Sequence, residues 1–445
     1  MRLEMLPAGS APVILTKMRK VVSNTDIYSS AKGFHGIDYI KITILGFGLS
    51  ALWACFHVII LQDMVPALVP EGLKHTYLGL LISAGAVIAM ATQPIVGAVS
   101  DRSGFSWGRR RPFILLGITL ALLFLPGIGF CGSYAVLFII YCLIQISTNI
   151  AQAPFQAFIP DLVPEGKRGR ASGVRNLLNI VGGATLIGVI GRFMGHYSAG
   201  EGSSWLWLSL GTLATVLLGA MLVTVLTVKE RPGAGGSQLP LLPTLYKSFK
   251  IDIKANRDFI LFLVACLFIF APWAALQTFA LPFLKHVVGI PHPEAATADL
   301  IIVVTVCMLA AVYPTGRLSD RVGRKPVLVP ACLLSALGVV ALFFSQSYTH
   351  ILLCGALLGI SGGAWMSSQW ALATDLVGKG EEARYLGLVN LVVCGGGVLG
   401  RLPVGGAIDF FNARSPNLGY SVMFLFCFIC FVVGSLLLLK IKGRT

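Results

Sequence analysis

The sequence predicts an all-α membrane protein with twelve transmembrane helices in two repeats of six. Three observations predict this fold class. Hydrophobic residues make up 56% of the 445 residues and charged residues only 12%, whereas a typical soluble chain carries about 25% charged residues. Long apolar runs recur along the chain, with the charges clustered between them. One set of residues also recurs at a constant spacing, which indicates that half of the chain is duplicated.

Each apolar run is long enough to cross a bilayer. A helix needs about 20 apolar residues to span a hydrocarbon core of roughly 30 Å. Backbone groups inside lipid must bond internally, and runs of this length form helices rather than barrel strands. We predict twelve spans, over residues 42–66, 77–99, 112–130, 134–158, 171–193, 204–228, 259–284, 297–317, 327–346, 350–373, 385–408 and 419–439.

The distribution of the net charge of +15 predicts the orientation. With the N-terminus inside, the inner segments hold 29 of the 34 Lys and Arg residues, the outer loops hold four, and Arg401 lies within a span. Because cytoplasmic segments carry an excess of Lys and Arg, we predict a multi-pass protein of the cytoplasmic (inner) membrane with both termini cytoplasmic. The basic residues then report topology and contact with anionic lipids rather than nucleic-acid binding.

An internal repeat splits the chain into two halves. Eight residues between Asp161 and Gly183 recur 214 positions later, from Asp375 to Gly397. Earlier in each half, the segment 97–102 has a counterpart 219 positions later. Two parallel six-helix repeats are an architecture of transporters, which hold their solute near the midplane between the halves.

These features divide the chain into five parts. The first 40 residues contain no apolar run long enough for a signal peptide, and all ten cysteines lie in or beside apolar runs, where packing is the expected role. We therefore predict no cofactor, disulfide or metal site. The predicted parts are a cytosolic tail (1–40), a six-helix bundle (41–228), a cytosolic linker (229–258), a second bundle (259–440) and a C-terminal tail (441–445).

The loop after the eighth span carries a known signature. Residues Gly316 to Lys325 fit the pattern G-x-x-x-D-R-x-G-R-[RK] without a gap, and a related segment follows the second span. The whole chain thus resembles the major facilitator superfamily. This resemblance implies two six-helix bundles related by a pseudo-twofold axis along the membrane normal, and transport of a small solute by alternating access.

A narrower resemblance appears in the first half. The segment 93–114 and the spacing N-x2-Q-x-P-x2-A-x3-D, which begins at Asn149 and ends at Asp161, are similar to those of the sucrose–proton symporters and related glycoside–cation symporters. Sucrose symporters carry an Arg, associated with sugar binding or proton coupling, where this chain has Gln156. The resemblance therefore implies a relative with an unassigned substrate rather than a sucrose carrier.

The family fold implies a gate on the cytosolic side. In it, Asp101 and Asp320 meet helices eleven and five of the other half, whose N-termini attract carboxylates. We expect these contacts to break when the gate opens. A purely topogenic role for the arginines 109–111 remains an alternative. The predicted gating residues are Asp101, Arg102, Asp161, Asp320, Arg321 and Asp375.

Three spans carry candidate substrate-binding residues. Gln145, Asn149, Gln152 and Gln156 share one face of the fourth span, which predicts cavity lining, with interhelical hydrogen bonding as the alternative. Tryptophan with an amide suits a polyol, although aromatic core packing is equally compatible. In the seventh and tenth spans this combination is formed by Trp273, Gln277, Trp365 and Gln369.

Ionisable residues inside spans are functional candidates because charge is costly in lipid. His57 and Asp63 in the first span are predicted to couple transport to a cation, H⁺ or Na⁺. Arg401 in the eleventh span pairs with a carboxylate or binds an anionic substrate, and the sequence does not choose between these roles.

The function predicted best is cation-coupled symport of a sugar or glycoside by a monomer in contact with lipid. The alternative is an efflux antiporter for small amphiphilic compounds. Such antiporters often have a G-P dipeptide in the fifth helix, and the segment 180–191 lacks proline. No P-loop, H-E-x-x-H motif or nucleophile elbow is present, so the chain is not predicted to be an enzyme.

Overall fold

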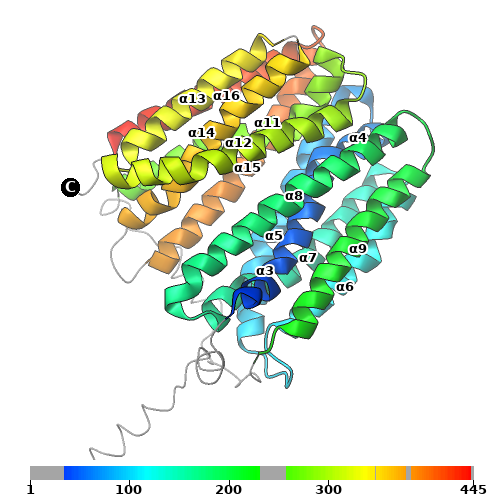
Figure 1. Cartoon of the computed structure of the whole chain (residues 1–445). Helices are drawn as coiled ribbons and strands as arrows, with labels where there is room; N and C mark the ends of the chain where they lie inside the picture. Colours follow the sequence, from blue (N-terminus) through cyan, green and yellow to red (C-terminus); the bar gives the residue numbers. More distant parts are fainter. Residues whose placement is uncertain (1–34, 231–256, 346, 377–381, 442–445) are drawn as a thin grey trace, which may run out of the picture.

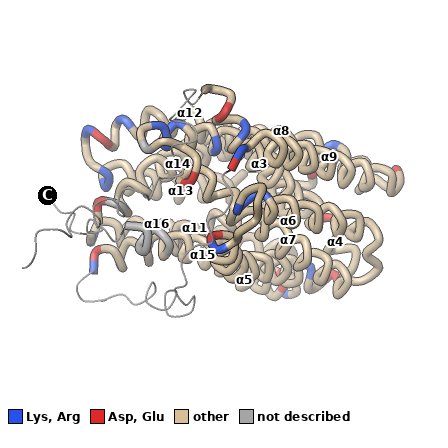
Figure 2. Tube along the Cα trace, turned by 90° about the horizontal axis from the view of Figure 1, so that it is seen from below, with Lys and Arg blue, Asp and Glu red and all other residues tan. Residues whose placement is uncertain are grey.

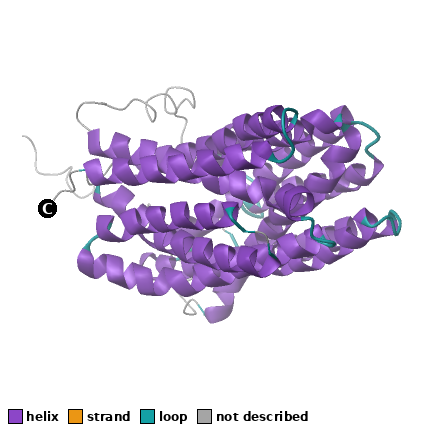
Figure 3. Cartoon of the chain, turned by 90° about the horizontal axis from the view of Figure 1, so that it is seen from above, coloured by secondary structure: helices purple, strands orange, loops and turns teal. Residues whose placement is uncertain are grey.

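The computed structural model describes residues 35–230, 257–345, 347–376 and 382–441. Within these residues every regular element is a helix (Figure 3), and twelve helices are long and apolar enough to cross a membrane. The prediction of twelve spans is confirmed. Most of the predicted tail (1–34), most of the predicted linker (231–256) and the last four residues lie outside the described part of the chain.

The first half contains six spans. The first and second spans are composite, and a π-helical turn interrupts the first. Their elements are α3 (Gly36–Cys55), the π-turn η1 (Phe56–Ile60), α4 (Leu61–Leu68), η2 (Glu71–Leu73) and α5 (Lys74–Asp101). The remaining elements are α6 (Arg111–Phe124), η3 (Leu125–Phe130), α7 (Tyr134–Leu162), η4 (Glu165–Lys167), α8 (Arg168–Ser198) and α9 (Ser204–Thr227).

The second half repeats the arrangement, with a π-helical turn at the end of its first span. Its elements are α11 (Arg257–Phe283), the π-turn η5 (Leu284–Val288), α12 (Pro293–Val322), α13 (Lys325–Phe343), α14 (Tyr348–Asp375), α15 (Glu382–Asn412) and α16 (Leu418–Lys440). Several helices are longer than the predicted spans, because hydropathy marks only the lipid-buried part whereas backbone hydrogen bonding continues into polar residues.

The two halves form two bundles that lie side by side, coloured blue to green and yellow-green to red in Figure 1. Helix α12 packs on α8, and α15 packs on α5, across the boundary between them. The repeat predicted from spacing is matched by position. Asp161 lies on α7 and Asp375 on α14, the fourth and tenth spans, while Asn176 and Asn390 lie on the fifth and eleventh.

The protein has two chemically different faces. We call the side with the α5–α6 and α12–α13 loops the basic face, because the residues in or directly beside these loops include Arg102, Arg109, Arg110, Arg321 and Arg324. The other side, where α5 and α12 begin, is the opposite face. Figure 2 shows Lys and Arg gathered at helix ends and loops, while the helices between them are almost free of charge.

Close packing joins the halves toward the opposite face. A Cβ atom added at Gly79 of α5 would lie 2.5 Å from the carbonyl oxygen of Arg401 on α15. One added at Gly191 of α8 would lie 2.8 Å from the Cβ of Ala298 on α12. Small residues allow such close approach of helix backbones, which is how helices commonly associate in lipid.

Candidate functional site

Two cavities meet at the boundary between the halves. The first cavity has a volume of about 340 Å³ and is lined mainly by α3, η1, α7 and α8. The second has a volume of about 480 Å³ and is lined almost entirely by helices of the second half. The cavities share four lining residues, Gln277, Ile301, Thr305 and Met308. Together they form a central site at the place predicted for a two-repeat transporter.

The first cavity is polar and carries an aromatic platform. His57 lies in the π-helical turn η1, a type of distortion that is frequent at functional sites. Its ring stacks on Trp53 with centroids 5.3 Å apart and planes 29° apart. Gln152 of α7 and Asn179 of α8 also line this cavity, so hydroxyl-binding amides stand beside a stacking surface.

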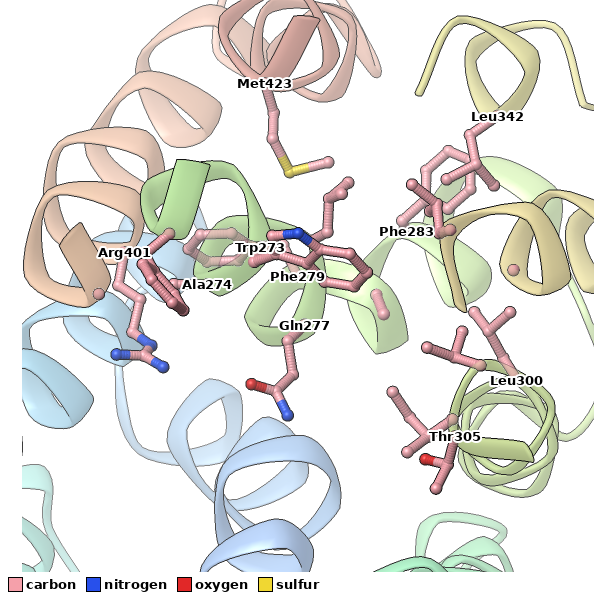
Figure 4. Close-up of a pocket in the computed structure, with 18 of the residues that line it drawn as sticks. Trp273, Ala274, Gln277, Phe279, Phe283, Leu300, Thr305, Leu342, Arg401 and Met423 are labelled. Atoms are coloured by element: carbon pink, nitrogen blue, oxygen red, sulfur yellow. The ribbon is translucent and has the colours of Figure 1, made fainter. Parts of the chain in front are cut away.

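The second cavity is mostly apolar, with a few polar groups near its boundary with the first. Trp273, Phe279, Phe283 and Met423 form an apolar recess. In Figure 4 the amide of Gln277 and the guanidinium of Arg401 point away from this recess, and the Thr305 hydroxyl lies on the same side of the view as the Gln277 amide. Such a site suits a solute with one apolar part and one hydrogen-bonding part.

A polar network connects His57 to the interior of the first half. His57 Nε2 and the Tyr141 hydroxyl are 3.0 Å apart, and Gln145 Nε2 donates to that hydroxyl at 2.9 Å. Asn149 Nδ2 donates to Gln145 Oε1 at 3.1 Å, and Gln93 Nε2 of α5 donates to Asn149 Oδ1 at 2.7 Å. The network fixes the orientation of His57 at the cavity wall.

These bonds correct the expectation that the whole polar stripe of the fourth span lines the cavity. Only Gln152 does so. Gln145 and Asn149 are buried and bond within the bundle, which is the interhelical alternative, and Gln156 is exposed and lines neither cavity. Helical spacing places residues on one face, but a face about three turns long passes from a helix contact to a cavity to solvent.

The tenth-span candidates also lie apart from the two cavities. Trp365 is buried, with its ring edge-on to Phe270 at a centroid distance of 6.2 Å. Gln369 is buried as well, and neither residue lines the first or the second cavity. The core-packing interpretation therefore describes this pair, whereas Trp273 and Gln277 of the seventh span line the second cavity as expected.

Asp63 lies in a buried acidic site that the sequence reveals only in part. Near it are Glu294, Lys285 and the hydroxyl of Ser198. Glu294 is only 2% exposed, and Lys285 Nζ is 4.0 Å from its Oε1. Two carboxylates confined with one ammonium repel each other unless a further cation is held between them. Glu294 was missed because it precedes the predicted eighth span and has the appearance of a loop residue.

A second buried cluster closes the opposite face. Asp409 of α15 accepts hydrogen bonds from His75 Nδ1 at 2.6 Å, from the Thr76 backbone N–H at 2.7 Å and from the Thr76 hydroxyl at 2.6 Å. His75 Nε2 is 2.8 Å from the hydroxyl of Tyr420. The carboxylate caps the N-terminus of α5 from the other half, where it also meets the positive end of the helix dipole.

Further hydrogen bonds and ion pairs join the two halves toward the opposite face. Besides the Asp409 cluster, Gln62 donates to the carbonyl oxygen of Thr278, and Lys74 Nζ is 3.1 Å from His286 Nε2. Arg192 approaches Asp299 at 4.0 Å. This conformation is therefore closed on the opposite face by polar contacts as well as by glycine packing.

On the basic face, the predicted gating carboxylates form a charge triad in each half. In the first triad, Arg110 pairs with Asp101 and, through Nε, with Asp161 at 3.0 Å. Arg109 joins this triad from outside, 2.8 Å from Asp161. The Arg110 side chain is only 5% exposed. Its backbone N–H donates to Glu230 at 2.8 Å, and burial raises the pKa of this carboxyl. Glu230, at the start of the predicted linker, is thus hydrogen-bonded to the signature loop.

The second triad repeats this arrangement nearer to solvent. Arg324 pairs with Asp320 and, at 3.4 Å, with Asp375. The Asp101 and Asp320 side chains are 56% and 68% exposed, and both pair within their own half rather than with the other half. Arg102 and Arg321 are exposed and belong to neither triad; the pairing arginine follows the signature glycine instead.

That glycine has a conformational role in both halves. Gly108 has φ +125° and Gly323 has φ +96°, backbone angles that other residues rarely adopt. The turn directs Arg110 and Arg324 back toward their two carboxylates. The glycine of the signature is therefore required by the geometry of the triad.

We expect Gly323→Ala to destabilise the protein by about 1–3 kcal/mol, because its φ of +96° and ψ of 164° fall in a region essentially limited to glycine. Thermal unfolding in detergent measures the loss. Gly211→Ala is the matched control, since this glycine lies inside α9 with open space around its Cβ position. Equal stability of the two variants would contradict this role.

Comparison with known proteins places this fold and site in a family. The family described as MFS/sugar transport protein matches residues 35–441, so the chain belongs to it. The sucrose transport protein SUT5 of Oryza sativa subsp. indica is 22% identical over 84% of this chain and 83% of its own length. The protein is thus an integral, multi-pass major facilitator transporter, and its relatives are transporters rather than enzymes.

Solved structures agree on the fold. A peptide transporter POT in complex with sulfate superposes with a TM-score of 0.72 at 13% identity, covering 94% of this chain and 98% of the other. A D-xylose–proton symporter superposes with a TM-score of 0.67 at 18% identity, covering 92% and 98%. At these identities the likeness shows the architecture alone.

Proposed function

We propose that this transporter moves a sugar or glycoside together with a cation by alternating access. The observation that carries the proposal is the central site, where Trp53 and Trp273 supply stacking surfaces and Gln152, Asn179 and Gln277 supply amides. Sugars are bound by this combination, since their rings have apolar faces and hydroxyl edges. The sucrose and xylose transporters among the similar proteins support the same class of solute.

Two sites are candidates for the coupling cation, one in the wall of the central cavity and one nearer to the opposite face. His57 lines the first cavity and forms a hydrogen bond with Tyr141. A proton bound at His57 would therefore change the charge next to the bound solute. The second site is the carboxylate pair Asp63 and Glu294, which joins α4 to α12 of the other half. We propose H⁺ at His57 as the primary coupling step.

The two faces alternate as gates in this proposal. The Asp409 cluster closes the opposite face, and the two triads stand on the basic face, which we assign to the cytoplasm from its excess of arginine. Asp101 and Asp320 are exposed here and available to meet the other half when the cytoplasmic side closes. Their proposed gating role thus belongs to the other conformation of the cycle.

Uptake into proteoliposomes tests this function. We expect labelled glycosides to accumulate above equilibrium when an inward gradient of H⁺ or Na⁺ is imposed, and only to equilibrate without it. A panel of monosaccharides, disaccharides and aryl glycosides identifies the solute. If only outward movement of lipophilic compounds responds to the gradient, the protein is an exporter and the proposal is wrong.

His57→Gln separates coupling from solute binding. We expect gradient-driven accumulation to fall at least tenfold, because the amide cannot carry a proton, while exchange of labelled for unlabelled solute continues. His196→Gln is the control: His196 is 47% exposed on the opposite face and bonds only to Glu201. Normal accumulation by His57→Gln, with loss in Asp63→Asn, would move the coupling site to the carboxylate pair.

A further inference from the structure

Arg401 is a partly buried cation for which no described carboxylate serves as partner. It lies on α15 within a membrane span and lines the second cavity. Its Nε donates to the Thr278 hydroxyl at 3.1 Å. Among the described residues, no carboxylate forms an ion pair with it; the ionisable side chains close to its charge are Tyr141, Cys394 and His57, none of which is a carboxylate.

An unpaired charge at this depth needs an explanation. Charged side chains inside membrane spans are costly and face cavities or pair with other groups. A buried guanidinium that lacks a counterion is expected to obtain one from a bound ligand, since removing the partner of a buried charge is strongly destabilising. The cavity beside Arg401 is the available source.

The direction of the side chain supports this. Figure 4 shows the guanidinium of Arg401 turned away from the apolar recess, to the side to which the Gln277 amide also points. Because Nε is held by Thr278, the two terminal nitrogens remain to bind a ligand. A guanidinium presents two parallel N–H donors in this way to a planar carboxylate.

The surroundings select the rest of the ligand. Trp273, Phe279 and Phe283 form the apolar recess above the polar groups, where only apolar surface can be buried without losing hydrogen bonds. A single positive charge balances one negative charge, so a monoanion fits better than a phosphate dianion.

We propose that the solute is an acidic glycoside, whose carboxylate binds Arg401 and whose apolar aglycone occupies the recess of the second cavity. The inference rests on the proposed function for the sugar part. The carboxylate part rests on Arg401 alone, so the two can fail separately.

Binding of a matched ligand pair to the full-length protein in detergent tests the carboxylate. Phenyl β-D-glucuronide and phenyl β-D-glucoside differ only in a carboxylate and a hydroxymethyl group. We expect the glucuronide to bind about ten- to hundredfold more tightly, as judged by ligand-induced thermal stabilisation and by equilibrium dialysis. Arg401→Gln should remove this preference, and Arg401→Lys should restore part of it.

The control variant is Arg414→Gln, an exposed arginine on the opposite face that donates to the Phe410 carbonyl oxygen of its own half, and this variant should keep the full preference. Equal affinity for the two glycosides in the wild type, or an unchanged preference in Arg401→Gln, overturns the inference and leaves the sugar proposal standing. Tighter binding of phenyl β-D-glucoside 6-phosphate than of the glucuronide overturns the choice of carboxylate.

Phenylacetate has the carboxylate and the aromatic ring but no sugar, so it tests whether the sugar component of the proposal is needed. If it binds in an Arg401-dependent manner as tightly as the glucuronide, the anion site is correct and the sugar component of the proposed function is wrong. If it binds at least tenfold more weakly than the glucuronide, both components are supported.

Discussion

Asp409→Asn is expected to open the opposite face. The carboxylate accepts four hydrogen bonds, from the backbone N–H and Nδ1 of His75 and from the backbone N–H and hydroxyl of Thr76. An amide keeps one acceptor oxygen and directs an NH₂ group at donors. Removing one partner of a buried charged pair costs about 3–5 kcal/mol, and each 1.4 kcal/mol is about a tenfold change in an equilibrium.

Because these bonds join the two halves, their loss should favour the conformation in which the opposite face is open by more than a hundredfold. Hydrogen exchange followed by mass spectrometry measures this as faster exchange in peptides covering 71–82 and 402–412. Glu201→Gln is the control on the same face, since Glu201 is 51% exposed and pairs with His196 of its own half. Unchanged exchange in Asp409→Asn would show that the glycine packing closes this face without the carboxylate.

The two triads provide a second large effect, through a difference between equivalent positions. Arg110→Met should destabilise the protein by about 1–3 kcal/mol, because Asp161, which is 18% exposed, then keeps only Arg109, whose side chain is 28% exposed. Arg324→Met should cost less than about 1 kcal/mol, because that arginine is 27% exposed and its two carboxylates are 56% and 68% exposed.

Unfolding in detergent, followed by tryptophan fluorescence, compares the two variants directly. Each is the control for the other, since both sit after the signature glycine in the same repeated motif. Equal destabilisation would mean that the shared motif, rather than burial, determines the contribution of the arginine.

The repeat also explains how the contact of α5 with α15 differs from the equivalent contact of α12 with α8. An offset of 219 residues maps His75 onto Glu294, and an offset of 214 maps Gly195 onto Asp409. At one boundary Asp409 caps α5 beside His75. At the other, a Cβ added at Gly195 would lie 3.9 Å from Glu294 Oε2. In one contact the carboxylate, Asp409, is thus on α15, and in the other the carboxylate, Glu294, is at the start of α12. Glu294 lies near Asp63 instead of capping the helix of the other half.

Much of the fold was determined by the sequence itself. Twelve spans, their order and the duplication follow from hydropathy and spacing, because lipid imposes a local requirement on every segment that crosses it. The signature loop located Asp101 and Asp320, but their ion pairs with an arginine of their own half were not predicted. His57, Gln152, Trp273 and Gln277 were predicted for the site and lie at the cavities.

Only the tertiary structure decided which side of each helix meets which neighbour. Spacing placed Gln145 and Asn149 on the same face as Gln152. In the structure α5 packs against this part of the face, and the first two residues form hydrogen bonds with each other and with α5. Asp409 became a helix cap because α5 begins beside it, and Arg401 has no carboxylate partner among the residues that the structure describes. A helix inside a bundle has several buried sides, and periodicity cannot tell a cavity from a neighbouring helix.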